Sequence, residues 1–163
     1  LHETLLINNN SKKPLVQRLD DLKIIVDAIF DHKKMIKFIY GKKWSSLDNE
    51  IKGKLEKTFL RYISFNYAKR FNGIKNLKFK IVKSEILSDS QVLIKTFMIT
   101  SEKDTVSFDY IFNKKDDDWK IFDILVEGSI SEVATKKSDF YQIIRQNGPL
   151  GLIEVINAKI ENN

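Results

Sequence analysis

The chain has 163 residues, of which 42% are hydrophobic and 31% charged, as expected for a single globular domain with a sizeable core. It contains no cysteine and only two histidines, which excludes disulfides, thiol catalysis and cysteine-based metal sites. No stretch approaches the roughly 18 consecutive apolar residues that a membrane-spanning helix needs.

The chain is basic, with a formal net charge of +6 and a pI of about 9.3. The cations are almost all lysine, whereas arginine is the residue that reads phosphates and base edges with two parallel hydrogen bonds. We therefore expect no nucleic-acid partner and interpret the lysines as a solvated surface. An anionic partner or membrane surface is the alternative interpretation.

Residues 1–13 begin with a short apolar patch and continue into an Asn-rich segment, so they are predicted to form an N-terminal tail. Residues 14–163 are predicted to form one domain, because no linker or internal repeat divides them. The chain opens with Leu1 rather than Met, which we interpret as a hint that a signal peptide has been removed before Leu1.

Three helices are predicted between Pro14 and Gly73. The first follows Pro14, where apolar residues recur every three or four positions. The second covers residues 33–40 and ends at Gly41. The third follows the capping sequence of residues 45–48, and its apolar residues repeat every four positions: Leu47, Ile51, Leu55, Phe59, Ile63, Tyr67 and Phe71.

After Gly73 the apolar period changes to two, which predicts four strands joined by short polar turns. Two short helices, over residues 138–146 and 150–160, are predicted to close the chain. The fold class is therefore α+β, with N-terminal helices packed on a curved antiparallel sheet of about four strands.

The sequence carries no glycine-rich phosphate loop, no zinc-protease motif and no serine-hydrolase motif. Asp116, Asp117 and Asp118 lie in a predicted hairpin turn without the glycine and glutamate of a calcium loop, so no metal site is expected. Asp31 and His32 could form a proton relay, but helix capping is the simpler interpretation.

Three carboxylates fall on predicted strands: Asp109, Asp123 and Glu127. Inside an apolar cavity such a group would have a raised pKa and could act as a general base, as in an isomerase. Alternation of side chains does not place Asp109 or Asp123 in a cavity, and a solvent-facing or structural role remains the alternative.

Eleven Phe, five Tyr and two Trp give an aromatic content of 11%, largely on the inward faces of the long helix and the sheet. Such faces can pack into a closed core or line a cavity for an apolar ligand. Composition alone does not separate these two possibilities.

Particular residues resemble those of the MlaC family, the toluene-tolerance periplasmic phospholipid-binding proteins. In the N-terminal half they are Val26-Asp27, Phe30-Asp31, Met35, Gly41, Trp44, Ser46, Phe59, Tyr62 and Tyr67-Ala68. The C-terminal half is more specific and comprises the run of residues 119–128 followed by Ile130-Ser131, Phe140, Ile143-Ile144, Gly148 and Leu152-Ile153. The resemblance spans residues 26–160 in the family's order.

The resemblance implies a cone similar to nuclear transport factor-like folds, with lipid acyl chains inside and the headgroup near the mouth. It implies a soluble periplasmic carrier that is not an enzyme and has no cofactor, its bound glycerophospholipid being cargo. The implied partners are an outer-membrane lipoprotein–porin complex and an inner-membrane ABC transporter with an MCE-domain ring, and the implied role is to maintain outer-membrane lipid asymmetry. We also expect a monomer.

The candidate lipid-binding residues are those that alternation places on the inward face of a strand or that lie on the inward face of a helix: Ile36, Ile39, Phe59, Ile63, Tyr67, Phe79, Ile81, Ile94, Phe108, Tyr110, Ile124 and Val126. The alternatives are a carrier of another apolar ligand such as a hopanoid, a small-molecule isomerase or dehydratase on a related cone, and an interaction module without a ligand.

Overall fold

The computed structural model describes residues 1–9, 12–100 and 105–162 of the chain. Its elements in chain order are α1 (His2–Asn8), α2 (Leu15–Ile29), α3 (His32–Tyr40), the 3-10 helix η1 (Lys42–Ser46), α4 (Asn49–Arg70), β1 (Lys78–Ser88), β2 (Gln91–Ile99), β3 (Thr105–Lys115), β4 (Asp118–Val126), β5 (Ile130–Ser131) and α5 (Glu132–Glu161). None of the helices in the described ranges is both long enough and apolar enough to cross a bilayer.

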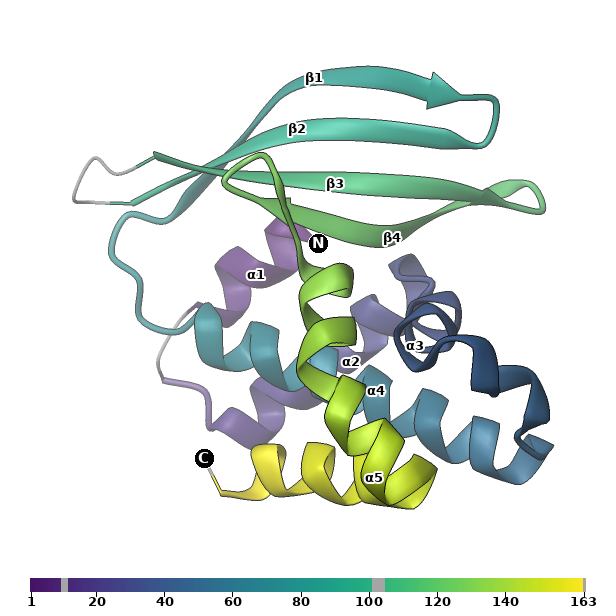
Figure 1. The fold of residues 1–163 in the computed structure, drawn as a ribbon. Coiled ribbons are helices and arrows are strands. Elements are labelled where there is room, and N and C mark those ends of the chain that lie inside the picture. Colours follow the sequence, from purple (N-terminus) through teal and green to yellow (C-terminus); the bar gives the residue numbers. More distant parts are fainter. Residues whose placement is uncertain (10–11, 101–104, 163) are drawn as a thin grey trace.

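The strands form one antiparallel sheet in the order β1-β2-β3-β4-β5, and the helices all lie on one side of it (Figure 1). The predicted α+β class and antiparallel sheet are confirmed. The sheet has five strands rather than about four, because two residues after the turn at Gly128 pair with the end of β4.

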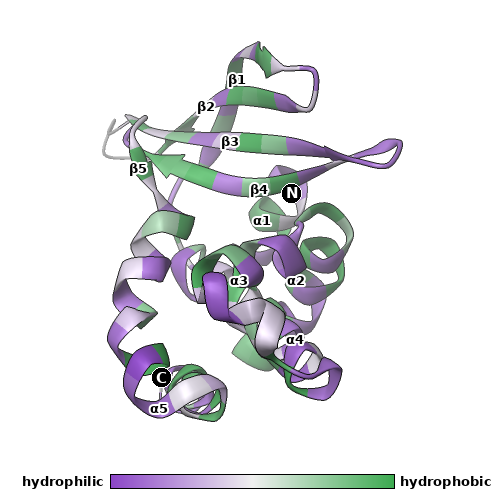
Figure 2. Cartoon of the chain, turned by 45° about the vertical axis from the view of Figure 1, so that its right-hand side comes forward, coloured by the Kyte–Doolittle hydropathy of each residue, from purple (hydrophilic) through white to green (hydrophobic). Residues whose placement is uncertain are grey.

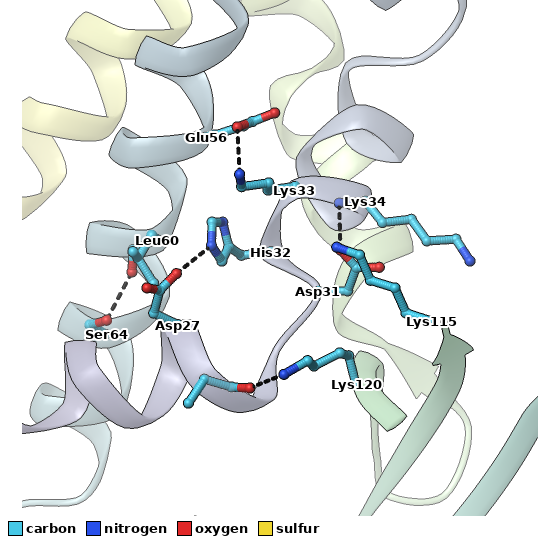
Figure 3. Close-up of polar contacts among 11 residues, drawn as sticks. Asp27, Asp31, His32, Lys33, Lys34, Glu56, Leu60, Ser64, Lys115 and Lys120 are labelled. Carbon is cyan, nitrogen blue, oxygen red and sulfur yellow. Dashed lines mark hydrogen bonds and ion pairs between the residues drawn. The ribbon is translucent and has the colours of Figure 1, made fainter. Parts of the chain in front are cut away.

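Three helices begin where a side chain caps the free backbone N–H groups of the first turn. Asp48 accepts from the N–H of Ile51 at 2.8 Å to start α4, and Ser131 accepts from the N–H of Ala134 at 2.9 Å to start α5. Asp31 caps α3, whereas the neighbouring His32 bonds to Asp27 at 2.9 Å (Figure 3). Asp31 thus has the capping role, and His32 pairs with a different carboxylate.

The N-terminal segment is not the loose tail that was expected, because it contains α1. Leu5 is fully buried, and the His2 ring stacks on Phe79 with a centroid distance of 4.2 Å. The Asn9 side chain donates to the carbonyl of Ile74 at 2.7 Å and accepts from its N–H at 2.9 Å. These tertiary contacts attach α1 to the segment that leads from α4 into β1.

The C-terminal helices are confirmed as two helical segments, but they are joined at a bend within α5. The bend is at Gly148, whose φ of 67° and ψ of −160° are not helical, and Pro149 follows in the first turn of the second segment. The first segment starts at Glu132 rather than at residue 138, because Ser131 caps it directly after β5.

The hydrophobic core lies between the helices and the inner face of the sheet, where Phe108, Tyr110 and Ile124 are buried. Figure 2 shows hydrophobic segments on the strands and along the helices. The edge strand β1 reaches past the helices, and Ile81 and Ile86 there are 63% and 83% exposed.

Candidate functional site

A cavity of about 420 Å³ opens between α4, the start of α5, α3 and β4. This volume falls within the range of roughly 300 to 1,000 Å³ typical of small-molecule sites. Its wall is mostly apolar and aromatic: Phe30, Met35, Phe59, Tyr62, Ile63, Tyr67, Ile124 and Val133. The remaining lining residues are polar or charged: Asn66, Lys69, Arg70, Glu132 and Lys136.

The helix α4 supplies half of the apolar wall residues and continues into the rim. Phe59, Ile63, Tyr67 and Arg70 are separated by four, four and three residues, so their side chains lie on the same side of the helix. The face is apolar at Phe59 and Ile63 and becomes charged at Arg70, the last residue of α4. The periodicity that buries α4 among α2, α3 and α5 therefore also gives the cavity an apolar end and a charged end.

We define the charged rim as Lys69, Arg70, Glu132 and Lys136, which are half-buried or exposed. Nη2 of Arg70 lies 3.3 Å from Oε1 of Glu132, and this ion pair joins the end of α4 to the start of α5. Lys136 also pairs with Asp139, its Nζ lying 3.2 Å from Oδ2. With both anions counted against the three cations, the rim keeps a net positive charge. An anionic group at the opening would be attracted to it.

Tyr67 is 6% exposed, and its hydroxyl has no hydrogen-bond partner among the described residues. Burial raises the pKa of this phenol well above its ordinary value, with a further contribution from the nearby Tyr110 hydroxyl and an opposing one from Arg70. Tyr67 therefore stays protonated and is a buried donor without an acceptor, a situation that is rare in folded proteins.

The carboxylate of Asp123 has a structural role. Its Oδ1 accepts from the N–H groups of Ile124 and Val133 at 2.8 and 3.1 Å, and its Oδ2 accepts from the Ser131 hydroxyl at 2.6 Å. Asp123 therefore attaches the start of α5 to β4.

Asp109 also binds locally, because its Oδ1 accepts from the N–H of Thr96 and the hydroxyl of Ser107, both at 3.0 Å. Neither Asp109 nor Asp123 lines the cavity, and Glu127 lies in an exposed turn with a φ of 53°. The described residues bring no three His, Asp or Glu side chains together in a way that could hold a metal ion. The cavity is thus lined by a buried tyrosine and has a charged rim, and its described lining residues include no buried carboxylate.

Of the twelve candidate residues, the structure places four on the cavity wall: Phe59, Ile63, Tyr67 and Ile124. Four others are buried in the core away from the wall: Ile36, Ile39, Phe108 and Tyr110. Phe79, Ile94 and Val126 are half-buried and also lie off the wall. Ile81 faces solvent, because β1 is the edge strand and its pairing with β2 shifts register between Ile81 and Lys83.

The sequence reasoning missed the rim and part of the wall. On α4, Tyr62, Asn66 and Arg70 follow Phe59 by three, seven and eleven residues, so the helical period could have identified them. Glu132, Val133 and Lys136 could not be found in this way, because they reach the cavity only through the packing of α5 against α4 and β4.

A sequence model of the family described as MlaC protein matches residues 3–158, nearly the whole chain. The chain belongs to the MlaC family. Among solved structures, this MlaC-family protein is similar to a phospholipid-binding protein from Ralstonia solanacearum, determined in complex with a phospholipid. The TM-score is 0.78 at 20% identity, over 98% of this chain and 91% of the other, which establishes the shared fold. No curated protein gives a significant match.

Proposed function

We propose that this MlaC-family protein binds a glycerophospholipid in the cavity and carries it through the periplasm. The observation that carries the proposal is the cavity itself, which combines an apolar wall on α4 with a positive rim at its opening. The phospholipid held by the Ralstonia solanacearum protein of the same fold supports this choice of ligand.

The energetics of such a carrier are set by the acyl chains. Burying about 15 methylenes at roughly 0.8 kcal/mol each removes a chain from water with a gain of about 12 kcal/mol. A bilayer offers nearly the same gain, so a pocket lined by Phe, Ile and Met exchanges lipid with a membrane at little net cost. Release into water is strongly disfavoured, as a shuttle requires.

Phe59, Ile63, Tyr67 and Ile124 are the residues that we assign to direct contact with the lipid. Ile36, Ile39, Phe108 and Tyr110 belong to the packed core off the wall, and we assign them no contact with the lipid. Because apolar burial has no direction, the wall accepts different acyl chains, while the rim adds a modest preference for anionic headgroups.

The family resemblance suggests the route of the cargo. In this proposal the carrier exchanges lipid with an outer-membrane lipoprotein–porin complex and with an inner-membrane ABC transporter that carries an MCE-domain ring. Its role is to maintain the lipid asymmetry of the outer membrane. Lipid exchange with purified complexes reconstituted in vesicles tests this route, and exchange with neither complex contradicts it.

The identity of the ligand is tested by exporting the protein to the periplasm of a Gram-negative host, purifying it and extracting it under denaturing conditions for lipid mass spectrometry. We expect near-stoichiometric glycerophospholipid with mixed headgroups. Folded protein without lipid, or with a hopanoid in place of phospholipid, would overturn the proposal.

A further inference from the structure

The cavity face of α4 changes polarity in a fixed order. Phe59 and Ile63 are apolar, Tyr67 carries a hydroxyl that is buried beside the cavity, and Arg70 places a cation at the rim. At a rise of about 1.5 Å per residue, Tyr67 lies about 4.5 Å along the helix axis from Arg70 and about 6 Å from Ile63. A glycerophospholipid has the same order of groups: a phosphate, then ester carbonyls a few bonds away, then acyl chains.

Packing of the aromatic ring fixes the position of the Tyr67 side chain along this face of α4. The ring packs against Phe30 and Phe71, with centroid distances of 5.8 and 5.7 Å. The Tyr67 hydroxyl has no partner among the described residues, and the hydroxyl of Tyr110 bonds instead to the His2 ring at 2.9 Å. A buried donor without an acceptor is costly, and the wall beside it is apolar. A ligand that enters the cavity and displaces the side chains over this hydroxyl would supply the acceptor.

We propose that Tyr67 donates a hydrogen bond to an acyl ester carbonyl of the bound lipid while the phosphate lies at the level of Arg70. Tyr67 would then make the cavity select ester-linked over ether-linked glycerophospholipids, which lack the carbonyl. This inference rests on the proposed function. An uncharged ester carbonyl suits the position because it accepts a hydrogen bond without bringing a charge into the apolar wall.

The test compares two probes with the same chains and headgroup, dipalmitoyl phosphatidylglycerol and its dihexadecyl ether analogue. Delipidated wild-type protein, Tyr67→Phe and Tyr110→Phe are each equilibrated with an equal mixture of the two, and the bound lipids are quantified by mass spectrometry. We expect the wild type to favour the ester about tenfold, the effect of one net hydrogen bond. The ratio should fall to near one in Tyr67→Phe.

Tyr110→Phe is the matched control, because it removes a buried hydroxyl that already has a partner and lies off the cavity wall. It should keep the wild-type ratio. Tyr67→Phe should also be at least as stable as the wild type without lipid, because it removes an unpaired polar group. An ester preference that persists in Tyr67→Phe, or equal binding of both probes by the wild type, would overturn this inference alone. Failure of both probes to bind would instead overturn the proposed function.

Discussion

Asp123 on β4 accepts a hydrogen bond of 2.6 Å from the hydroxyl of Ser131, the residue that caps α5. The same carboxylate also accepts from the N–H of Val133. One buried side chain thus joins the sheet to the helix that supplies Glu132, Val133 and Lys136 to the cavity. This contact therefore helps to position Glu132 and Lys136, the two rim residues on α5.

Asp123→Asn should destabilise the fold, because an amide has one acceptor oxygen and cannot reproduce all three contacts of the carboxylate. We expect a loss of about 1–3 kcal/mol in the free energy of unfolding, measured with urea. Asp117→Asn, in an exposed hairpin turn, is the control and should leave stability nearly unchanged. Equal effects of the two substitutions would argue against a structural role for Asp123.

Two glycines should respond to alanine in opposite directions. Gly148 has a φ of 67° and a ψ of −160°, a conformation that an L-residue adopts only with strain, so Gly148→Ala should cost about 1–3 kcal/mol. Gly53 lies within α4, and an added Cβ there meets no atom within 4 Å, so Gly53→Ala should stabilise by about 0.5–1 kcal/mol. Urea unfolding of both variants checks this. Stabilisation by Gly148→Ala would show that α5 does not need the bend.

The attachment of α1 should weaken in acid. The pKa of His2 is lowered from 6.5 to about 4. Burial is the larger cause, and the positive charge of the N-terminus is the smaller one. Between these values the unfolded chain binds a proton that the folded chain does not. The contribution of the neutral ring to stability is therefore complete above pH 6.5 and is lost as the pH falls towards 4.

Unfolding free energies of the wild type and His2→Phe, measured from pH 7 to pH 4, test this effect. The difference between the two proteins isolates His2 from the other titrating groups. Wild-type stability should fall more steeply than that of His2→Phe over this window, and parallel curves would contradict the account.

Much of the fold could be predicted from local patterns. The four-residue apolar period and the acidic cap located α4, and alternation identified Phe108 and Tyr110 as inward-facing. The segment containing α1 was missed because it is only seven residues long and its first turn has no side-chain cap. Its helix is stabilised by distant partners, as the contacts of Asn9 with Ile74 show.

The cavity was less predictable than the core. The alternation of side chains along a strand shows on which face of the sheet a residue lies, but not whether another side chain covers it. Phe108 and Ile124 both face inward from neighbouring strands, yet only Ile124 reaches the cavity, while Phe108 packs against Phe71. Alternation also places Ile81 on the inward face, but no helix covers it and its side chain is exposed. These distinctions depend on how far the helices extend beneath the sheet, which no local pattern encodes.

The central claim is that the cavity beside α4 holds the lipid, and lipid content after periplasmic expression tests it most directly. Ile63→Glu places a carboxylate in the apolar wall at a cost of several kcal/mol, and Ile63→Trp fills the cavity without a charge. Ile24→Glu, at a position that is 76% exposed on α2, is the control. We expect phospholipid in the wild type and in Ile24→Glu, and little in either folded Ile63 variant. Full lipid content in both Ile63 variants would contradict the account.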